Sequence, residues 1–264
     1  MDFRTLRLQI EGPIARVTLS RPDAANRVDA RLLRELTAAC ETIAANDAVC
    51  VTLLTADGPD FCAGWDPELS PLPREGEGAA PRRQTTPRLP LDPFGPVAAL
   101  PAPVIAATHG ATLSAGLELA LACDIRIAAE DARFALPEVS QGTLPLAGGS
   151  QRLPRVASRA VAASMLLLGD ELDAQAAYRV GLVSRVFPAA VLASEAEALA
   201  QRIAAHGPLA LRYAKEAVHH GAELSLDQAL RYELDLSVIL QTTRDRAEGV
   251  RAFLEKRPPK FEGR

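Results

Sequence analysis

Alternating apolar and polar positions predict a β-hairpin near the start of the chain. The stretch LRLQIEGPIARVTLS at 6–20 alternates on both sides of Glu11-Gly12-Pro13, as paired strands joined by a tight turn do. A helix is predicted next, with Asp29 as its capping residue. Its apolar positions recur at helical spacing: Leu32, Leu33, Leu36, Cys40 and Ile43. The order strand, strand, helix therefore opens the chain.

Short apolar runs and helical segments alternate farther along. The runs are VCVTLLT at 49–55, VIAATH at 104–109 and DIRIAA at 124–129, and an apolar helical stretch separates the last two. Continuous apolar runs of this length are typical of strands buried on both faces. Because strands alternate with helices, the sequence predicts an α/β fold.

Two regions depart from this alternation. Ten of the 20 prolines fall between Pro67 and Pro103, which predicts a long loop that is partly mobile. From about residue 190 the strand signals end, and four amphipathic helices are predicted. Their segments are ASEAEALAQRIAAH, PLALRYAKEAVHH, LSLDQALRYELDLSVILQTT and DRAEGVRAFLEK. We therefore predict a core over 1–190 and a helical region over 191–264.

Composition narrows the classes of function. The 264 residues are 48% hydrophobic and carry a net charge of −4 from 29 basic and 33 acidic residues, which argues against a nucleic-acid-binding surface. No apolar run is long enough to predict a membrane span, and MDFRTLRLQI alternates like a strand and does not resemble a signal peptide. The four cysteines are scattered without a CxxC pair, so we expect a cytoplasmic protein without a metal site.

One acidic residue stands in an apolar setting. In LSAGLELALACDI at 113–125, Glu118 is surrounded by small and apolar residues, so a helix here offers it no polar face. An ionised carboxylate is rarely buried without a partner. Glu118 is therefore either a paired structural acid or a catalytic group.

A second carboxylate and two glycine-containing turns complete a candidate site. Glu138 follows Pro137 and precedes the glycine-containing loop QGTLPLAGG, where it could also act as a cap. The turns FCAGWD at 61–66 and HGATLSAG at 109–116 each follow a predicted strand. Ligand sites of α/β folds form at such strand ends, and free backbone N–H groups there can stabilise an oxyanion.

These motifs resemble the crotonase superfamily, also called the enoyl-CoA hydratase/isomerase family, from about residue 5 to about residue 260. The stretches that carry the resemblance are RPDAAN at 21–26, FCAGWD at 61–66, the long segment 103–155, GLVSRVFP at 181–188 and EGVRAFLEKRPPKF at 248–261. The resemblance implies a spiral of ββα units that binds acyl-CoA and carries out catalysis, followed by a helical C-terminal trimerisation region. It also implies a homotrimer or a dimer of trimers.

The resemblance assigns roles within this site. The thioester oxygen would accept hydrogen bonds from the backbone N–H groups of Trp65 and Ala115, while Glu118 mainly activates water and Glu138 mainly transfers the α-proton. Coenzyme A is then part of the substrate, and no other cofactor is expected. Residues expected to contact the substrate or CoA are Ala24, Arg27, Ala63, Gly64, Trp65, Asp66, Leu146, Phe253 and Lys256, the last from a neighbouring subunit.

The chain departs from the family pattern at three positions. Asp23 and Glu68 stand where hydratases of the family often carry lysines that contact CoA phosphates, and Leu146 stands where a small residue is common beside the catalytic water. Arginines could take over the phosphate contacts. The candidates are Arg27 and the loop residues Arg74, Arg82, Arg83 and Arg88.

Three functions fit these features to different degrees. The two glutamates favour an enzyme that adds water across the 2,3 double bond of a 2-enoyl-CoA and so forms 3-hydroxyacyl-CoA. The alternative is an enoyl-CoA isomerase or another crotonase-type lyase that uses Glu138 alone. A non-catalytic acyl-CoA-binding relative ranks last, because loss of one glutamate would be its expected sign.

Overall fold

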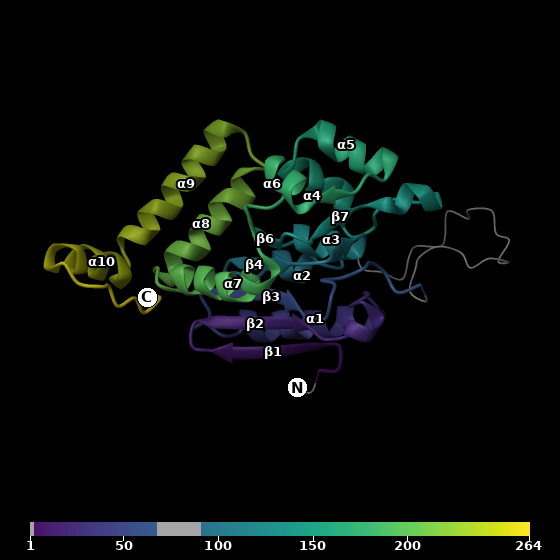
Figure 1. Ribbon diagram of the computed structural model, residues 1–264. Coiled ribbons are helices and arrows are strands. Elements are labelled where there is room, and N and C mark those ends of the chain that lie inside the picture. The colour runs from purple at the N-terminus through teal and green to yellow at the C-terminus, as the bar shows by residue number, and fades with distance from the viewer. Residues whose placement is uncertain (1–2, 68–90) are drawn as a thin grey trace.

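The computed structural model describes residues 3–67 and 91–264, and Figure 1 shows its strands and helices in chain order. The strands are β1 (Leu6–Glu11), β2 (Ile14–Leu19), β3 (Val51–Ala56), β4 (Val104–Thr108), β5 (Ala111–Leu113), β6 (Ile125–Ala129), β7 (Arg133–Ala135), β8 (Leu172–Asp173) and β9 (Arg185–Phe187). The α-helices are α1 (Ala30–Ala44), α2 (Gly95–Ala98), α3 (Ala115–Leu121), α4 (Gly149–Val156), α5 (Arg159–Leu168), α6 (Ala174–Arg179), α7 (Ala189–Ala204), α8 (Pro208–Gly221), α9 (Leu226–Gln241) and α10 (Arg244–Glu255). Two 3₁₀ helices are η1 (Pro22–Ala24) and η2 (Pro137–Gln141).

The larger sheet has the strand order β1-β2-β3-β4-β6-β9. β1 and β2 form the predicted antiparallel hairpin, and every later neighbour in this sheet pairs in parallel. Parallel neighbours need crossover connections, and α1 and α3 lie in two of these connections. The predicted α/β class is therefore confirmed.

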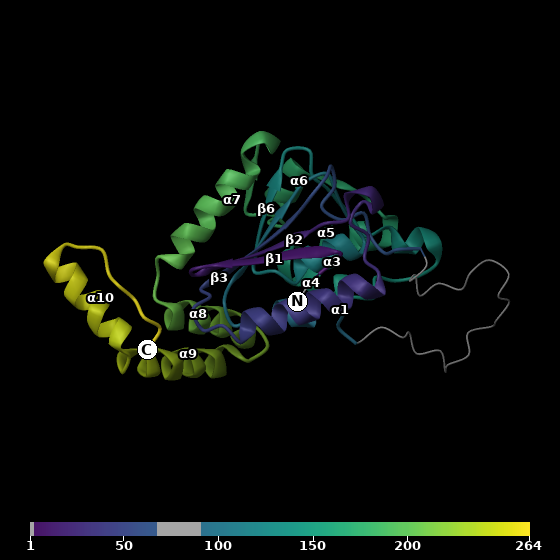
Figure 2. The same ribbon diagram turned by 90° about the horizontal axis from the view of Figure 1, so that it is seen from below.

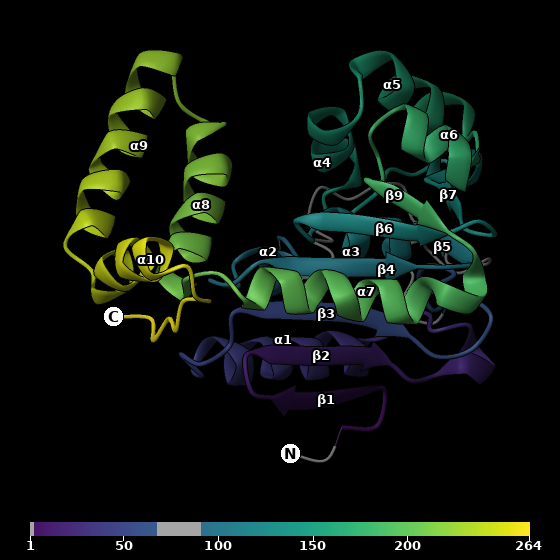
Figure 3. The ribbon, with the colours of Figure 1, turned by 60° about the vertical axis from the view of Figure 1, so that its left-hand side comes forward.

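Helices cover both faces of this sheet because successive side chains of a strand point to opposite sides. Leu54 of β3 packs in one cluster with Leu36 and other buried residues of α1, whereas Leu53 packs in another with Leu192 of α7. Figure 3 shows α7 lying across the face of the sheet opposite α1. The side chains of the continuous apolar run of β3 therefore pack against helices on both faces of the sheet.

Helix α3 lies between two hydrophobic clusters, and all seven of its residues are buried. Leu119 belongs to the cluster of α1, while Leu117 and Leu121 pack with Phe134 and residues of α4, α5 and α6. A small second sheet with the order β5-β7-β8 leads into α3 and into η2. This arrangement leaves Glu118 without a solvent-facing side of the helix.

The prediction of a long loop between Pro67 and Pro103 is wrong near its C-terminal end, where a short helix interrupts it. Residues 95–98 form α2, and Phe94, Val97 and Leu100 are buried against the main core. Three apolar residues at this spacing lie on one side of a helical turn and anchor it. Residues 68–90 of the predicted loop, which include its four arginines, lie outside the described residues.

The predicted C-terminal helices correspond to α7, α8, α9 and α10. Helix α7 packs on the sheet through Leu192, Ala196 and Ala200. The other three extend away from the sheet, as Figures 1 and 2 show from two sides. The division of function between 1–190 and 191–264 stays a prediction.

Candidate active site

Glu118 is fully buried on α3, and its carboxylate faces the start of α4. Its Oε1 accepts hydrogen bonds from the backbone N–H groups of Ala147 at 2.7 Å and Gly149 at 2.8 Å. Its Oε2 has no hydrogen-bond partner among the described residues. One oxygen is therefore held firmly, and the other is free to receive a proton.

The environment of Glu118 raises its pKa to about 7. Burial is the largest cause, and the nearby charge of Glu138 adds to it. The two backbone N–H donors and the positive charge of Arg152 oppose the shift. A carboxyl group with this pKa exchanges protons readily near neutral pH, which suits a general acid or base.

The close contact between Glu118 and the turn depends on a glycine. A Cβ atom on Gly149 would lie 3.1 Å from both Cγ and Oε1 of Glu118 and 3.0 Å from Cβ of Pro145. A side chain at 149 would therefore be crowded by both Glu118 and Pro145. Glycine at 149 therefore lets the backbone N–H approach the carboxylate.

Glu138 lies in η2 and is also buried, with 6% of its surface exposed. Within the described residues neither of its carboxylate oxygens has a hydrogen bond of ordinary geometry. Burial raises the pKa of Glu138, and the nearby Ser114 hydroxyl opposes that rise. A buried carboxyl without partners favours its protonated form, so Glu138 is suited to deliver a proton.

Two backbone segments bring the predicted oxyanion donors together. Residues 61–63 run beside β5, with the N–H of Phe61 bonded to the carbonyl of His109 and that of Cys62 to Ala111. A Cβ atom on Gly64 would lie 3.1 Å from Cβ of Ser114. The residues that precede Trp65 and Ala115 are thus adjacent in space.

The backbone N–H groups of Trp65 and Ala115 have no partner among the described residues. Ala115 is the first residue of α3, and the first N–H groups of a helix lack partners within it. Ser114, directly before it, has φ +51° and ψ −122°, a conformation that non-glycine residues rarely adopt. Such strain is typical of functional sites, and the pair of free donors matches the oxyanion hole that the sequence predicts.

The Trp65 indole stacks on the Phe94 ring, with centroids 6.1 Å apart and planes inclined by 17°. Phe94 is fully buried, whereas Trp65 is half-buried. This contact fixes the segment that carries the Trp65 N–H group. The predicted role of Trp65 as an acyl-pocket wall stays a prediction.

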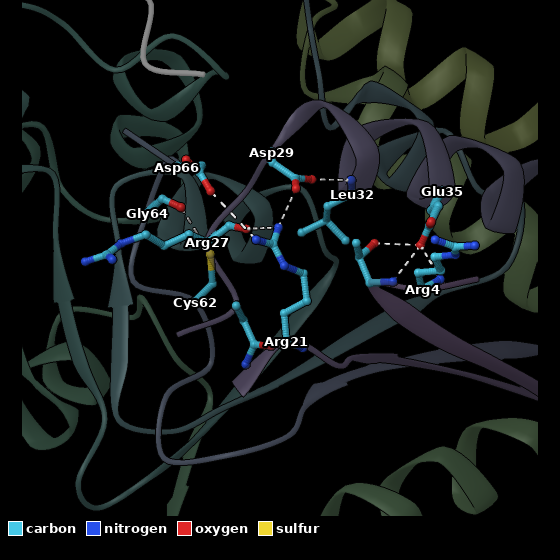
Figure 4. Close-up of polar contacts among 11 residues, drawn as sticks. Arg4, Arg21, Arg27, Asp29, Leu32, Glu35, Cys62, Gly64 and Asp66 are labelled. Carbon is cyan, nitrogen blue, oxygen red and sulfur yellow. Dashed lines mark hydrogen bonds and ion pairs between the residues drawn. The ribbon is translucent and has the colours of Figure 1, made fainter. Parts of the chain in front are cut away.

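Three of the residues expected to contact CoA, Arg27, Gly64 and Asp66, lie around one ion-pair network, shown in Figure 4. Arg21 Nη1 lies 2.5 Å from Asp29 Oδ2, and Arg21 Nη2 lies 3.7 Å from Asp66 Oδ2. Asp29 also caps α1 through the N–H of Leu32. Arg21 therefore joins the RPDAAN turn to the FCAGWD turn.

The Arg27 side chain is exposed and forms no ion pair among the described residues, and Figure 4 shows it extending away from this network. Next to it, the N–H of Ala63 donates to the carbonyl of Ala25 at 3.0 Å. Ala24, Ala63 and Gly64 lie in these two joined turns. Within the described part of the chain, the Arg27 cation is thus unpaired and lies beside the turns predicted to contact CoA.

The other residues predicted to contact the substrate, Leu146, Phe253 and Lys256, lie in two separate parts of the structure. Leu146 is half-buried and adjoins Ala147, one of the donors to Glu118. Phe253 is 82% exposed on α10, and Lys256 ends that helix. Figure 1 shows α10 far from α3 and α4, so this subunit does not bring Phe253 and Lys256 to its own site.

Sequence reasoning did not identify the two backbone donors to Glu118, nor Arg152 and Asp92 beside them. The consecutive glycines at 148 and 149, where a helix begins, were the available signal. The ion pair between Arg152 and Asp92 joins residues 60 positions apart. No local pattern indicates such a pair.

The fold and the site together define an α/β enzyme whose candidate site holds two buried carboxyl groups and two backbone N–H groups without partners among the described residues. The family model for enoyl-CoA hydratase/isomerase matches residues 9–264. The chain belongs to the enoyl-CoA hydratase/isomerase family, and the predicted family is confirmed.

Relatives with similar sequences carry hydratase names. The chain is 41% identical over 94% of both chains to the 2,3-dehydroadipyl-CoA hydratase of Escherichia coli K12. It is 35% identical over 99% of both chains to the crotonyl-CoA hydratase of Syntrophomonas wolfei. These enzymes show the chemistry found among similar sequences.

Solved structures confirm the crotonase-like fold. The enoyl-CoA hydratase of Bacillus anthracis superposes with a TM-score of 0.88 at 35% identity, covering 99% of this chain and all of that one. Within residues 3–67 and 91–264, no helix is long and apolar enough to cross a membrane.

Proposed function

We propose that this protein is an enoyl-CoA hydratase, which adds water across the 2,3 double bond of a 2-enoyl-CoA thioester to give a 3-hydroxyacyl-CoA. The observation that carries the proposal is Glu118, held through one oxygen by two N–H groups while its pKa is raised to about 7 near Glu138. The hydratase names of full-length relatives support it.

The reaction begins with polarisation of the thioester. The backbone N–H groups of Trp65 and Ala115 donate to the carbonyl oxygen and stabilise the negative charge that develops there. Electron density is drawn from the double bond, so the β-carbon becomes electrophilic. Hydrogen-bond donors of an oxyanion hole typically contribute ~3 kcal/mol each to the barrier.

Water then adds with the help of both carboxylates. Ionised Glu118 accepts a proton from water as its oxygen attacks the β-carbon, and protonated Glu138 delivers a proton to the α-carbon. The water oxygen joins the β-carbon, one water proton moves to Glu118, and the Glu138 proton joins the α-carbon. A proton then returns from Glu118 to Glu138 before the next turnover. Since the two carboxyl groups interact, their two apparent pKa values describe the pair and not either residue alone.

The proposed reaction needs no cofactor beyond the CoA of the substrate. The N–H groups polarise the thioester and the two glutamates move the protons, so the described residues supply each required chemical role. We include Arg27 as a phosphate contact because its guanidinium is exposed beside the turns at 24–26 and 63–66. Lys256 of a neighbouring subunit is a second candidate.

We also propose that the protein forms a homotrimer or a dimer of trimers. Large apolar side chains are exposed on α9 and α10: Leu226, Leu230, Leu234, Val238, Ile239, Val250, Phe253 and Leu254. Clustered exposed apolar residues typically mark protein interfaces. A subunit packed on these helices would cover them.

We also propose that the protein is located in the cytoplasm. All four cysteines are buried free thiols, and a protein of the reducing cytoplasm keeps its thiols in this form. Fractionation of the native host, followed by detection of the protein, tests the location.

A direct hydration assay tests the catalytic proposal. The purified protein is mixed with crotonyl-CoA, longer 2-enoyl-CoA esters and 2,3-dehydroadipyl-CoA, and loss of the conjugated double bond is followed by ultraviolet absorbance. Mass spectrometry should show a product heavier by one water. The proposal fails if no thioester in the panel is hydrated, and 3-enoyl-CoA esters reveal double-bond migration.

A further inference from the structure

Arg152, on the first turn of α4, contacts the same residue that holds Glu118. Its Nη1 donates to the carbonyl of Ala147 at 2.9 Å, while the N–H of Ala147 donates to Glu118. Both hydrogen-bonding groups of the Ala147 backbone are therefore used. Any displacement of this residue by loss of Arg152 would move a donor of Glu118.

Gly148, the N-cap of α4, and Gly149, its first residue, make room for different partners. A Cβ atom on Gly148 would lie 2.4 Å from Arg152 Nη1, and the residue has φ +97°. Gly149 instead admits the Glu118 carboxylate. The turn is thus shaped for the guanidinium on one side and for the carboxylate on the other.

Asp92 holds Arg152 from a separate part of the chain. Its Oδ1 and Oδ2 accept from Nη1 at 3.2 Å and from Nη2 at 2.6 Å, which is a bidentate pair. Two residues later, Phe94 stacks on Trp65. The segment 92–94 therefore supports both the Glu118 turn and the segment that carries an oxyanion donor.

A role in stability alone does not explain this arrangement. The Arg152 and Asp92 side chains are 21% and 43% exposed. An ion pair with this degree of exposure typically contributes less than ~1 kcal/mol to the stability of the fold. Orientation of a catalytic group matters more, because a displacement of about 1 Å can lower a rate about 100-fold.

We infer that Arg152, held by Asp92, is a positioning residue that fixes the turn at 147–149 against Glu118 for water activation. The inference rests on the proposed hydration. The charged groups that act on Glu118 are Glu138 and Arg152. Loss of Arg152 therefore removes the positive charge that balances Glu138, in addition to one support of the turn.

The kinetic test compares variants of the full-length protein. Arg152→Met keeps side-chain length but removes the charge and the donors, and Arg152→Lys keeps the charge without the bidentate geometry. Arg155→Met is the matched control, since Arg155 lies on the same helix with 58% of its side chain exposed and pairs with Glu223. Asp92→Asn removes the charge of the residue that holds Arg152 in place. It replaces Arg152→Met in the test if that variant does not fold.

We expect Arg152→Met to lower kcat roughly 10- to 100-fold with less than about a threefold change in KM. The acidic limb of its kcat profile should shift to higher pH, because Glu118 loses a cation that favours its ionised form. Arg152→Lys should lower kcat with a smaller pH shift, and Asp92→Asn, which leaves the Arg152 charge in place, should lower kcat without that upward pH shift. A parent-like kcat and pH profile in Arg152→Met, or a loss of kcat in that variant without a pH shift, would overturn the inference.

Infrared spectroscopy separates this inference from the proposed activity. The carboxylic-acid C=O band that disappears in Glu118→Gln reports protonated Glu118 without any turnover. In Arg152→Met this band should persist to higher pH than in the parent and in Arg155→Met. An unshifted band would contradict placement of Glu118 by Arg152, whereas a shifted band in a protein that hydrates no thioester would contradict only the proposed function.

Discussion

Gly116 of α3 lies directly against the backbone of Cys62, and a Cβ atom at 116 would lie 2.2 Å from the Cys62 carbonyl oxygen. This contact brings the start of α3, with the Ala115 N–H, beside the segment that carries Trp65. The close approach of the two proposed oxyanion donors therefore depends on the absence of a side chain at residue 116.

We predict that Gly116→Ala separates these donors. Alanine favours a helix by ~1 kcal/mol over glycine, so any loss of stability must come from the contact with Cys62. We expect kcat/KM for crotonyl-CoA to fall roughly 100-fold or more. Gly249→Ala is the control, because its Cβ would meet only Phe261 at an ordinary 3.6 Å. Equal activity in the two variants would show that the contact does not position the donors.

The paired-carboxylate mechanism predicts strong effects at both acids. Glu118→Gln and Glu138→Gln should each lower hydration roughly 100- to 10,000-fold, with the circular dichroism spectrum and CoA-ester binding retained. Steady-state kinetics and calorimetry measure these quantities. The isomerase alternative predicts that Glu138→Gln is inactive while Glu118→Gln keeps most double-bond migration. Parent-like hydration by Glu118→Gln would make Glu118 a structural acid.

The raised pKa of Glu118 predicts a pH-dependent stability. Between the unfolded pKa near 4.5 and the folded pKa of about 7, the folded state binds more protons, so this group's contribution to stability falls as pH rises. A shift of this size corresponds to roughly 3 kcal/mol. Glu118→Gln can still accept both N–H bonds without a charge. Urea unfolding should therefore show the variant more stable than the parent at pH 8, with little difference at pH 4.5, and a parent that is favoured at pH 8 would contradict this.

Arg27 is predicted to contact the CoA phosphates. Arg27→Glu should raise KM for crotonyl-CoA several-fold, more at low salt than at high salt, because exposed charges are screened. Arg202→Glu on α7 is the control, since α7 covers the opposite face of the sheet from α1. An unchanged KM in Arg27→Glu would place the phosphate contact elsewhere, with Lys256→Glu as the next variant to measure.

The exposed apolar residues of α9 predict an assembly that a charge can weaken. The parent should have the mass of a trimer or hexamer in multi-angle light scattering at micromolar concentration. Leu234→Asp should shift the population towards smaller species, because Leu234 is 62% exposed in the subunit and a buried unpaired charge costs several kcal/mol. Val218→Asp on α8 is a comparably exposed control. A monomeric parent would overturn the proposed assembly.

The sequence by itself determined the elements and the unusual acid. Alternation around Glu11-Gly12-Pro13 predicted the hairpin, and the apolar runs predicted the buried strands, because strand and helix periods follow from local backbone geometry. The apolar surroundings of Glu118 already required a partner or a function. The family motifs then indicated Glu138 and the two turns.

Only the tertiary structure decided how that acid is held. Glu118 accepts from donors 29 and 31 residues away, and Arg152 pairs with Asp92 across 60 residues. Hydrogen bonds between such distant groups depend on how α3, α4 and the segment before α2 pack together. The periodicity of the sequence does not predict this packing. Burial by that same packing gives Glu118 its raised pKa, because a pKa responds to surroundings in space and not to neighbours in the chain.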